Sequence, residues 1–265
     1  VCPEQGIGDE LLFTRFLPLL AELGAECVTF CDARLVDLLR ASGLPGRFLP
    51  YTAEGAAEVS DADFQIGAGS LASKFIHTTD DLKRLSKRPF LFPDRENAKT
   101  LRAKYLNLRQ TNRVIGISWR GGGNEAMRRK RTIDIEAFLP LFQHADTQFI
   151  SLQYGDTKAD LKKVSELNTP GLYEDPDIDP IADIEGFIDQ IEACDLVISI
   201  DNSTVHLAGA IGKETWALLP LNCDWRWGTE AHRNFWYDSV TLFRQTRALD
   251  WEMVIRMVKA ALYSL

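Results

Sequence analysis

The chain has 265 residues, of which 45% are hydrophobic, and it carries a formal net charge of -8. This length can bury a substantial core, and the negative charge disfavours broad binding to nucleic acid or to an anionic membrane. Because no apolar run approaches the roughly 18 residues of a membrane span and no signal-like leader opens the chain, we expect a globular cytoplasmic protein that is not membrane-spanning.

The first half of the chain alternates short β-rich runs with helical patterns. Its opening residues have the character of a strand already in progress, which indicates a segment of a longer chain. An apolar helical pattern covers residues 11–23, strands are predicted at 26–31 and 63–67, and a helix at 33–41 ends at Gly43. Such alternation predicts a doubly wound α/β sheet.

A glycine-rich turn, GIGDE, precedes the first helical pattern. Gly6 and Gly8 let the backbone come close to a ligand. The turn does not complete the GxGxxG fingerprint, because Leu11 and Leu12 stand around the position of the third glycine, so dinucleotide binding has little support. Asp9 is expected at the mouth of the sheet, where its carboxylate either takes a proton from an incoming hydroxyl or caps the following helix. The sequence favours neither role over the other.

The composition turns polar and basic between residues 82 and 110, which predicts one domain at 1–110 and a second at 111–265. The second half restarts the same alternation, with strands predicted at 114–119, 148–152, 196–200 and 215–219 and helices at 135–142 and 184–194. Two Rossmann-like domains are the simplest account. An amphipathic helix at 250–265 could pack on either of them.

Two loops of the second half follow predicted strands. The first reads RGGGNEAMRRKRT from Arg120, and its cations and glycines could wrap a diphosphate, although a solvated, mobile basic loop is the alternative. The second reads SLQYGD from Ser151 and could present backbone groups to a nucleobase, although an ordinary exit from a strand explains it equally well. If both loops leave carboxyl ends of parallel strands, they open on one crevice.

The stretch DNSTVHLAGAIGK, residues 201–213, predicts a helix that begins directly after a buried strand. Its first residues supply caps and free backbone N–H groups, and the helix dipole adds to them, so we expect an anion site there. His206 would lie one turn into this helix, either donating to an oxyanion or packed in the core. Gly209 is expected to let the helix approach the sheet closely.

Other chemistry has weaker support. The block Trp225, Trp227, Trp236 and Tyr237 could line a sugar site, but packing in the core or between domains is favoured. His77, His144 and His232 have no partner pattern, and the five cysteines show no CxxC spacing, so we expect no metal site. The sequence contains no GxSxG motif, which disfavours a covalent hydrolase mechanism.

Taken in order, QGIGDE, GISWRGG, RTIDIEAF, SLQYGD, DNSTVHLAGAIGK and LLPLNCDWRWG resemble the glycosyltransferases of the GT-B fold. The chain is most similar to the heptosyltransferase-like (family 9-like) catalytic domains that often follow tetratricopeptide repeats, and is distantly similar to O-linked N-acetylglucosamine transferases. The resemblance implies two Rossmann-like domains facing a cleft. The C-terminal domain would hold a nucleotide-diphosphate sugar, and the N-terminal domain would approach a protein or glycan acceptor.

The resemblance also implies roles for individual residues. Asp9 falls on the family's base toward the acceptor hydroxyl, with Gly6 and Gly8 in the acceptor-side loop. The donor would be bound by residues of three loops, namely Ser118, Trp119, Arg120, Arg131, Gln153, Tyr154, Asp201, Asn202, Ser203 and Thr204. His206 would assist the departing diphosphate. The final helix would return to the N-terminal domain, and the reaction would be inverting, with no metal and no cofactor.

Two departures and two alternatives remain. Asn202 and Ser203 stand where heptosyltransferases often have Thr-Gly, so the identity of the donor cannot be transferred. A noncatalytic nucleotide-sugar-binding or scaffolding module is the main alternative to an enzyme. A nicotinamide-dependent oxidoreductase is disfavoured by the incomplete glycine fingerprint.

Overall fold

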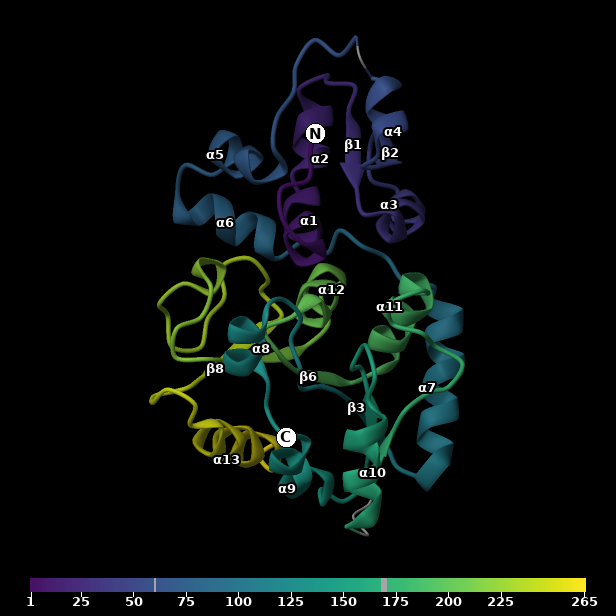
Figure 1. Cartoon of the computed structure of the whole chain (residues 1–265), viewed down its shortest axis with the longest axis vertical. Coiled ribbons are helices and arrows are strands. Elements are labelled where there is room, and N and C mark those ends of the chain that lie inside the picture. The colour runs from purple at the N-terminus through teal and green to yellow at the C-terminus, as the bar shows by residue number, and fades with distance from the viewer. Residues whose placement is uncertain (60, 168–170) are drawn as a thin grey trace.

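The computed structural model describes residues 1–59, 61–167 and 171–265. Within them, two parallel sheets lie one above the other in Figure 1, each accompanied by helices. The small sheet pairs β1 (Val28–Cys31) with β2 (Arg47–Pro50). The large sheet has the order β5 (Leu172–Tyr173), β4 (Thr147–Ser151), β3 (Arg113–Ser118), β6 (Leu196–Ile200), β7 (Thr215–Leu219) and β8 (Val240–Arg244). The predicted α/β architecture is confirmed.

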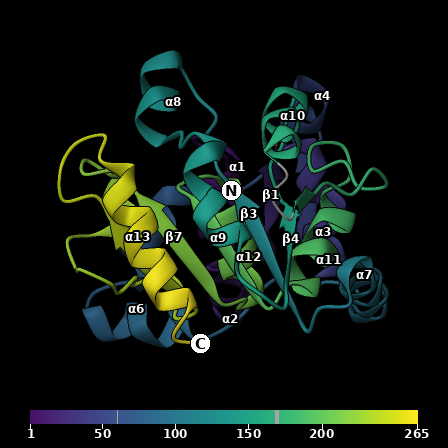
Figure 2. The same cartoon turned by 90° about the horizontal axis from the view of Figure 1, so that it is seen from below.

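Strands β4, β6 and β7 are buried along their whole length because helices cover both faces of the large sheet. Side chains alternate between the two faces, so that Val197 and Ile198 lie in different apolar clusters. One face is covered by α11 (Ile184–Ala193) and α12 (Ser203–Ile211). The other carries η3 (Ile135–Phe138), α9 (Leu139–Phe142) and α13 (Trp251–Leu262), as the view from below shows (Figure 2).

The order of the large sheet creates a switch point between β3 and β6. From β3 the chain moves outward through β4 and β5, and it then returns to the other side of β3 for β6, β7 and β8. In open α/β sheets the crevice outside the carboxyl ends at such a point is where ligands bind. The loops that follow Ser118 and Ile200 therefore border the crevice, as the sequence predicted.

The N-terminal part is a small unit set above α12 (Figure 1). Its helical elements are α1 (Ile7–Thr14), α2 (Leu17–Glu22), η1 (Ala33–Leu35), α3 (Val36–Ala41), α4 (Ala53–Ala57), η2 (Ala68–Leu71), α5 (Ala72–Phe75) and α6 (Thr79–Ser86). Helix α1 packs against α12. One apolar cluster runs from Leu11 of α1 to Leu242 of β8, so the two parts share a core.

Two predicted elements of this unit are wrong. The helix expected at 11–23 is two helices, because the chain turns at Arg15 and Phe16 and the second helix begins at Leu17, with Pro18 in its first turn. The strand expected at 63–67 is absent from the described residues, where only Gly67 forms a bridge, with Cys2. Phe64 of that segment is 92% exposed, so one of its few apolar side chains adds nothing to a core.

Two further helices pack on a different part of the chain than expected. Helix α13 packs on β8 and η3 of the large sheet, which corrects the expectation that the final helix returns to the N-terminal domain. Helix α7 (Arg95–Arg109), which precedes residue 111, lies against α11 and β3 of the C-terminal part. The domain boundary at 110 itself stays a prediction.

The basic loop after β3 contains a helix, α8 (Glu125–Arg131), whose first turn is capped by the Asn124 side chain. Helix α10 (Lys158–Glu166) follows β4, and the 3₁₀ helix η4 (Trp225–Trp227) follows β7. None of the helices in the described ranges is long and apolar enough to cross a bilayer.

Candidate functional site

Three buried polar side chains hold the strand ends together beneath the crevice. The Gln153 carbonyl oxygen, after β4, accepts hydrogen bonds from the backbone N–H groups of Trp119 (2.9 Å) and Arg120 (2.7 Å). The Asn202 amide, after β6, donates to Ser118 Oγ (2.7 Å) and to the Arg120 carbonyl (3.2 Å). Ser118, Gln153 and Asn202, which we predicted as donor-binding residues, therefore form the frame that fixes the loops.

The start of α12 lies at this frame. Asn202 caps it by accepting from the Thr204 N–H (3.0 Å), while Ser203 is partly exposed. The Thr204 side chain is fully buried, and its hydroxyl has no hydrogen-bond partner in the described structure. The Thr204 N–H is occupied by this cap, and the Val205 N–H donates to the Asn202 carbonyl at 3.2 Å, so the helix dipole is the main attraction that this end of α12 offers to an anion. The predicted anion site stays a prediction.

Asp201 and Arg131 link the end of β6 to α8 by an ion pair of 3.4 Å between Oδ2 and Nε. Burial raises the pKa of the Asp201 carboxyl, and the nearby Arg131 opposes that shift. Arg131 stays partly exposed at the crevice. It is thus placed to contact a ligand anion, with Asp201 holding its guanidinium in position.

The predicted ligand residues of the other loops do not converge on one surface, namely Arg120, Trp119 and Tyr154. The Arg120 guanidinium turns to α10, where it pairs with Asp160 at 3.3 Å and donates to the Asp156 carbonyl. Trp119 is fully buried and donates from its indole to Asp160 at 2.9 Å. The Tyr154 hydroxyl lies against the backbone of the glycine loop after β3, close to that crevice. Of these three, the side chain of Trp119 cannot contact a ligand without moving.

Asp9 comes to the site from the opposite side, in the first turn of α1. Its Oδ1 accepts a hydrogen bond from the guanidinium of Arg226 in η4, which also pairs with Asp224 at 3.1 Å. The Arg226 side chain is 6% exposed and that of Asp9 is 14% exposed, so the ion pair is mostly buried, with Asp9 as its more exposed member. Asp9 does not cap the helix, because Gly6 occupies that position.

Arg226 is a functional candidate that the sequence reasoning missed. The DWRW segment was considered only for its aromatic rings. A charged residue between two tryptophans was the available signal, because an arginine in an apolar block is buried only when it has a partner.

His206 is packed between the two parts of the molecule. Its ring lies 5.5 Å from that of Trp227, and its Nδ1 is 3.0 Å from the Tyr237 hydroxyl. A Cβ atom added to Gly8 would lie 2.8 Å from the ring. Burial, aided by the neighbouring Arg226 and other arginines, lowers the pKa of His206 to about 3, so the imidazole is neutral near pH 7. The structure favours the packed histidine over the proton donor.

The aromatic block forms the contact between the two parts, as the favoured alternative predicted. The Arg15 guanidinium from the end of α1 lies over the rings of Phe90 and Tyr237, at 4.9 and 4.8 Å from their centroids. It also donates to the Trp236 carbonyl. Trp225 alone of the block is exposed, at 60%.

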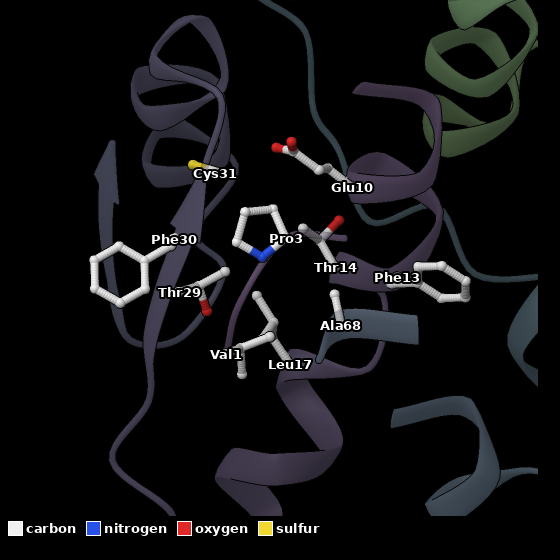
Figure 3. A pocket seen from close by; sticks show the side chains of 10 residues that line it. All are labelled: Val1, Pro3, Glu10, Phe13, Thr14, Leu17, Thr29, Phe30, Cys31 and Ala68. Atoms are coloured by element: carbon white, nitrogen blue, oxygen red, sulfur yellow. The ribbon is translucent and has the colours of Figure 1, made fainter. Parts of the chain in front are cut away.

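A small internal space in the N-terminal unit is unrelated to the crevice. It lies between α1 and β1, with Glu10 and Cys31 among its lining residues (Figure 3), and has a volume of about 10 Å³. Such a volume corresponds to about one water molecule. The Glu10 carboxylate accepts from the Asp32 N–H at 2.7 Å, and burial raises its pKa. This space is too small for a substrate.

Comparisons with known proteins address the fold. No protein-family model matches the chain. Protein FlbA of Caulobacter vibrioides is 27% identical over 278 residues, a match that covers 99% of this chain and 46% of FlbA. The chain thus spans about half the length of this curated relative.

Solved structures match along the whole chain. Heptosyltransferase II of E. coli, described as an ADP-heptose LPS heptosyltransferase, has a TM-score of 0.66, 10% identity and coverage of 100% of this chain and 99% of its own. A family 9 glycosyltransferase of Veillonella parvula has a TM-score of 0.60, 13% identity and coverage of 99% and 90%. The fold is that of the GT-B glycosyltransferases. E. coli heptosyltransferase WaaC, solved with ADP-2-deoxy-2-fluoro heptose, matches this GT-B chain with a TM-score of 0.58, 9% identity and coverage of 99% and 98%.

At these identities the likeness concerns the fold. The predicted resemblance to heptosyltransferases is confirmed at that level. The more distant resemblance to O-linked N-acetylglucosamine transferases and the association with tetratricopeptide repeats stay predictions.

Proposed function

We propose that the chain is a glycosyltransferase that moves a sugar from a nucleotide-diphosphate donor to a hydroxyl of a protein or glycan, with inversion and without a metal. The GT-B fold supports sugar transfer as the reaction class. The observation that carries the proposal is the position of Asp9, whose carboxylate from the N-terminal unit faces a guanidinium of the large-sheet part beside the start of α12.

The charges suit a displacement at the anomeric carbon. Asp9 Oδ2 has no hydrogen bond within the described residues. It takes the proton of the acceptor hydroxyl while the acceptor oxygen bonds to the anomeric carbon. The bond from that carbon to the diphosphate breaks, and its electron pair leaves with the nucleoside diphosphate. Arg131 and the dipole of α12 offset the charge of the leaving group. This fixed cation and the helix dipole are the reason for proposing a metal-independent reaction.

The donor can be identified by a thermal-shift panel of UDP, GDP, ADP and CMP, each with and without magnesium. We expect one nucleotide to raise the Tm, because a ligand that binds the folded state stabilises it. The shift should persist in EDTA if the diphosphate is held by protein groups. A response to none of the nucleotides would contradict the proposed donor site.

The base is tested with Asp9→Asn, assayed with the sugar donor of the nucleotide so identified. We expect turnover to fall by about 100-fold or more, the range for loss of a general base, with nucleotide affinity retained. The asparagine oxygen can still accept from Arg226, so the fold should persist. Asp37→Asn, which removes a carboxylate from an exposed pair with Arg40, is the matched control. Unchanged turnover of Asp9→Asn would refute the assignment.

A noncatalytic sugar-nucleotide-binding module is the second candidate. It is favoured by the contact of the Arg226 guanidinium with Asp9, which occupies one carboxylate oxygen in a mostly buried ion pair. This function predicts stabilisation by a nucleotide without hydrolysis or transfer of any donor sugar. If tetratricopeptide repeats accompany the domain in a longer chain, a protein acceptor or partner fits both candidates.

A further inference from the structure

A large cavity lies beside the crevice, at the carboxyl ends of β7 and β8. It has a volume of ≈ 730 Å³, within the range of ligand pockets. One wall is α8, from its N-cap to Arg129 and Lys130 in its last turn, and the other is made by the segments after the two strands, including Leu221 and Gln245. Figure 2 shows α8 standing above the sheet. No residue of the proposed reaction lines this cavity.

Gln245, one of the residues that line this cavity, carries an unpartnered donor. The residue is 4% exposed, and its carbonyl oxygen accepts from the backbone N–H groups of Leu221 and Leu249, both at 3.2 Å. These two bonds fix which end of the amide is oxygen. The amide nitrogen is buried without a hydrogen-bond partner among the described residues. A buried donor left in this way needs an acceptor atom from a ligand or from water.

The charges of the cavity select the kind of acceptor. Helix α8 carries the consecutive residues Arg128, Arg129, Lys130 and Arg131 in a chain whose net charge is -8. Of these four, Arg131 alone forms an ion pair within the described structure. Arg129 and Lys130 line the cavity, where Glu125 is the single acidic residue. Two cations and an amide donor favour anionic oxygen.

We propose that this cavity is a second binding site, which takes the phosphate or carboxylate of a sugar-sized ligand. The anion contacts Arg129 and Lys130, and one acceptor oxygen receives the free N–H of Gln245. The segment after β7 runs from this cavity at Leu221 to Arg226 at Asp9, so the site adjoins the proposed reaction. It does not depend on that reaction, because binding here requires neither Asp9 nor transfer.

Isothermal titration with glucose 6-phosphate, glucuronate and glucose tests the site. We expect one or both anions to bind and glucose to bind at least about tenfold more weakly, because it lacks the charge. Binding of glucose 6-phosphate alone identifies a phosphate ligand, and binding of glucuronate alone identifies a carboxylate.

Two variants locate the anion. Gln245→Glu keeps an oxygen for the N–H groups of Leu221 and Leu249 and replaces the free donor with a negative oxygen, so the affinity should fall by about tenfold or more. Lys130→Ala should also weaken binding and, on an exposed helix, should keep the fold. Arg128→Ala, on the same helix but outside the cavity lining, is the control and should leave the affinity unchanged.

Four outcomes would overturn the inference. They are the absence of binding by either anion at millimolar concentration, equal binding of glucose, insensitivity to both Gln245→Glu and Lys130→Ala, and an effect of Arg128→Ala as large as that of Lys130→Ala. If Arg131→Ala abolishes binding while Gln245→Glu and Lys130→Ala do not, the anion occupies the switch-point crevice instead. Failure of the transferase assay leaves all of these measurements intact.

Discussion

His206 illustrates how a residue that looks catalytic in the sequence can be structural. It lies one turn into the helix that borders the crevice, as predicted, but its ring is covered by Gly8, Trp227 and Tyr237. Its burial, and not its place near the crevice, decides its role, because a charged imidazole there would lose its hydration and lie among arginines. The sequence could not reveal this, because the covering residues lie far away in the chain.

The neutral state of His206 predicts a pH-dependent stability. Its pKa falls from the ordinary 6.5 to about 3, so between these values the unfolded chain binds more protons than the folded chain. His206 therefore does not lower the free energy of unfolding above about pH 6.5. Below that pH the unfolded chain takes up a proton that the folded chain does not, and the free energy of unfolding falls by up to about 1.4 kcal/mol per pH unit.

The measurement is urea unfolding of the wild type and His206→Asn at about pH 7.5 and pH 5.5. The wild type should lose about 1 kcal/mol more than the variant between these values, whatever the two stabilities at the higher pH. Equal losses would show that His206 titrates normally in the folded state.

At the scale of elements, the close packing around α1 and α12 depends on one glycine in each helix. A Cβ added to Gly8 would lie 2.8 Å from the His206 ring, and one added to Gly209 would lie 2.5 Å from the Tyr237 ring. Gly209 was predicted to allow close approach to the sheet, but the group that approaches it is this aromatic ring. Both glycines thus set how closely neighbouring groups approach the two helices.

Gly8→Ala should therefore destabilise the protein by about 1–3 kcal/mol, the cost of overpacking, although alanine ordinarily favours a helix over glycine. Gly6→Ala is the control, because no atom lies within 4 Å of its added Cβ, and it should change stability by less than about 1 kcal/mol. Chemical denaturation gives both values. A stabilised Gly8→Ala variant would mean that α1 is not packed on His206.

The elements of the large sheet were predictable because a parallel strand buried on both faces is a continuous apolar run. The strands at 196–200 and 215–219 were predicted with their observed bounds. Strand β8 and helix α10 were not predicted, since their burial is partial and their patterns are weak. For the site, strand-end loops were predictable by topology, whereas the Asp9–Arg226 pair was not, because no local pattern joins residues 217 positions apart.

For the whole molecule, the shared core has a consequence for unfolding. The apolar cluster that joins α1 to the large sheet includes Leu11, Phe16 and Trp236, and Arg15 adds cation–π contacts between the two parts. Neither part can lose its structure without exposing apolar surface of the other. The molecule should therefore unfold as one cooperative unit despite its two sheets.

Coincident urea transitions test this expectation. Far-ultraviolet circular dichroism follows the helices, and tryptophan fluorescence follows the aromatic contact between the parts. We expect the same midpoint from both probes. Two separated transitions would show that the small unit unfolds independently.

The contact of Arg15 with Trp236 spans 221 positions, which sets an order of events during synthesis. Translation at about 5–20 residues per second separates the two by roughly 10–45 s. Throughout that interval Leu11 and Phe16, which are fully buried in the finished protein, lack their partners from the C-terminal part. Helix α1 thus leaves the ribosome well before its C-terminal partners and is among the later elements to reach its final surroundings, with its apolar face uncovered until they arrive.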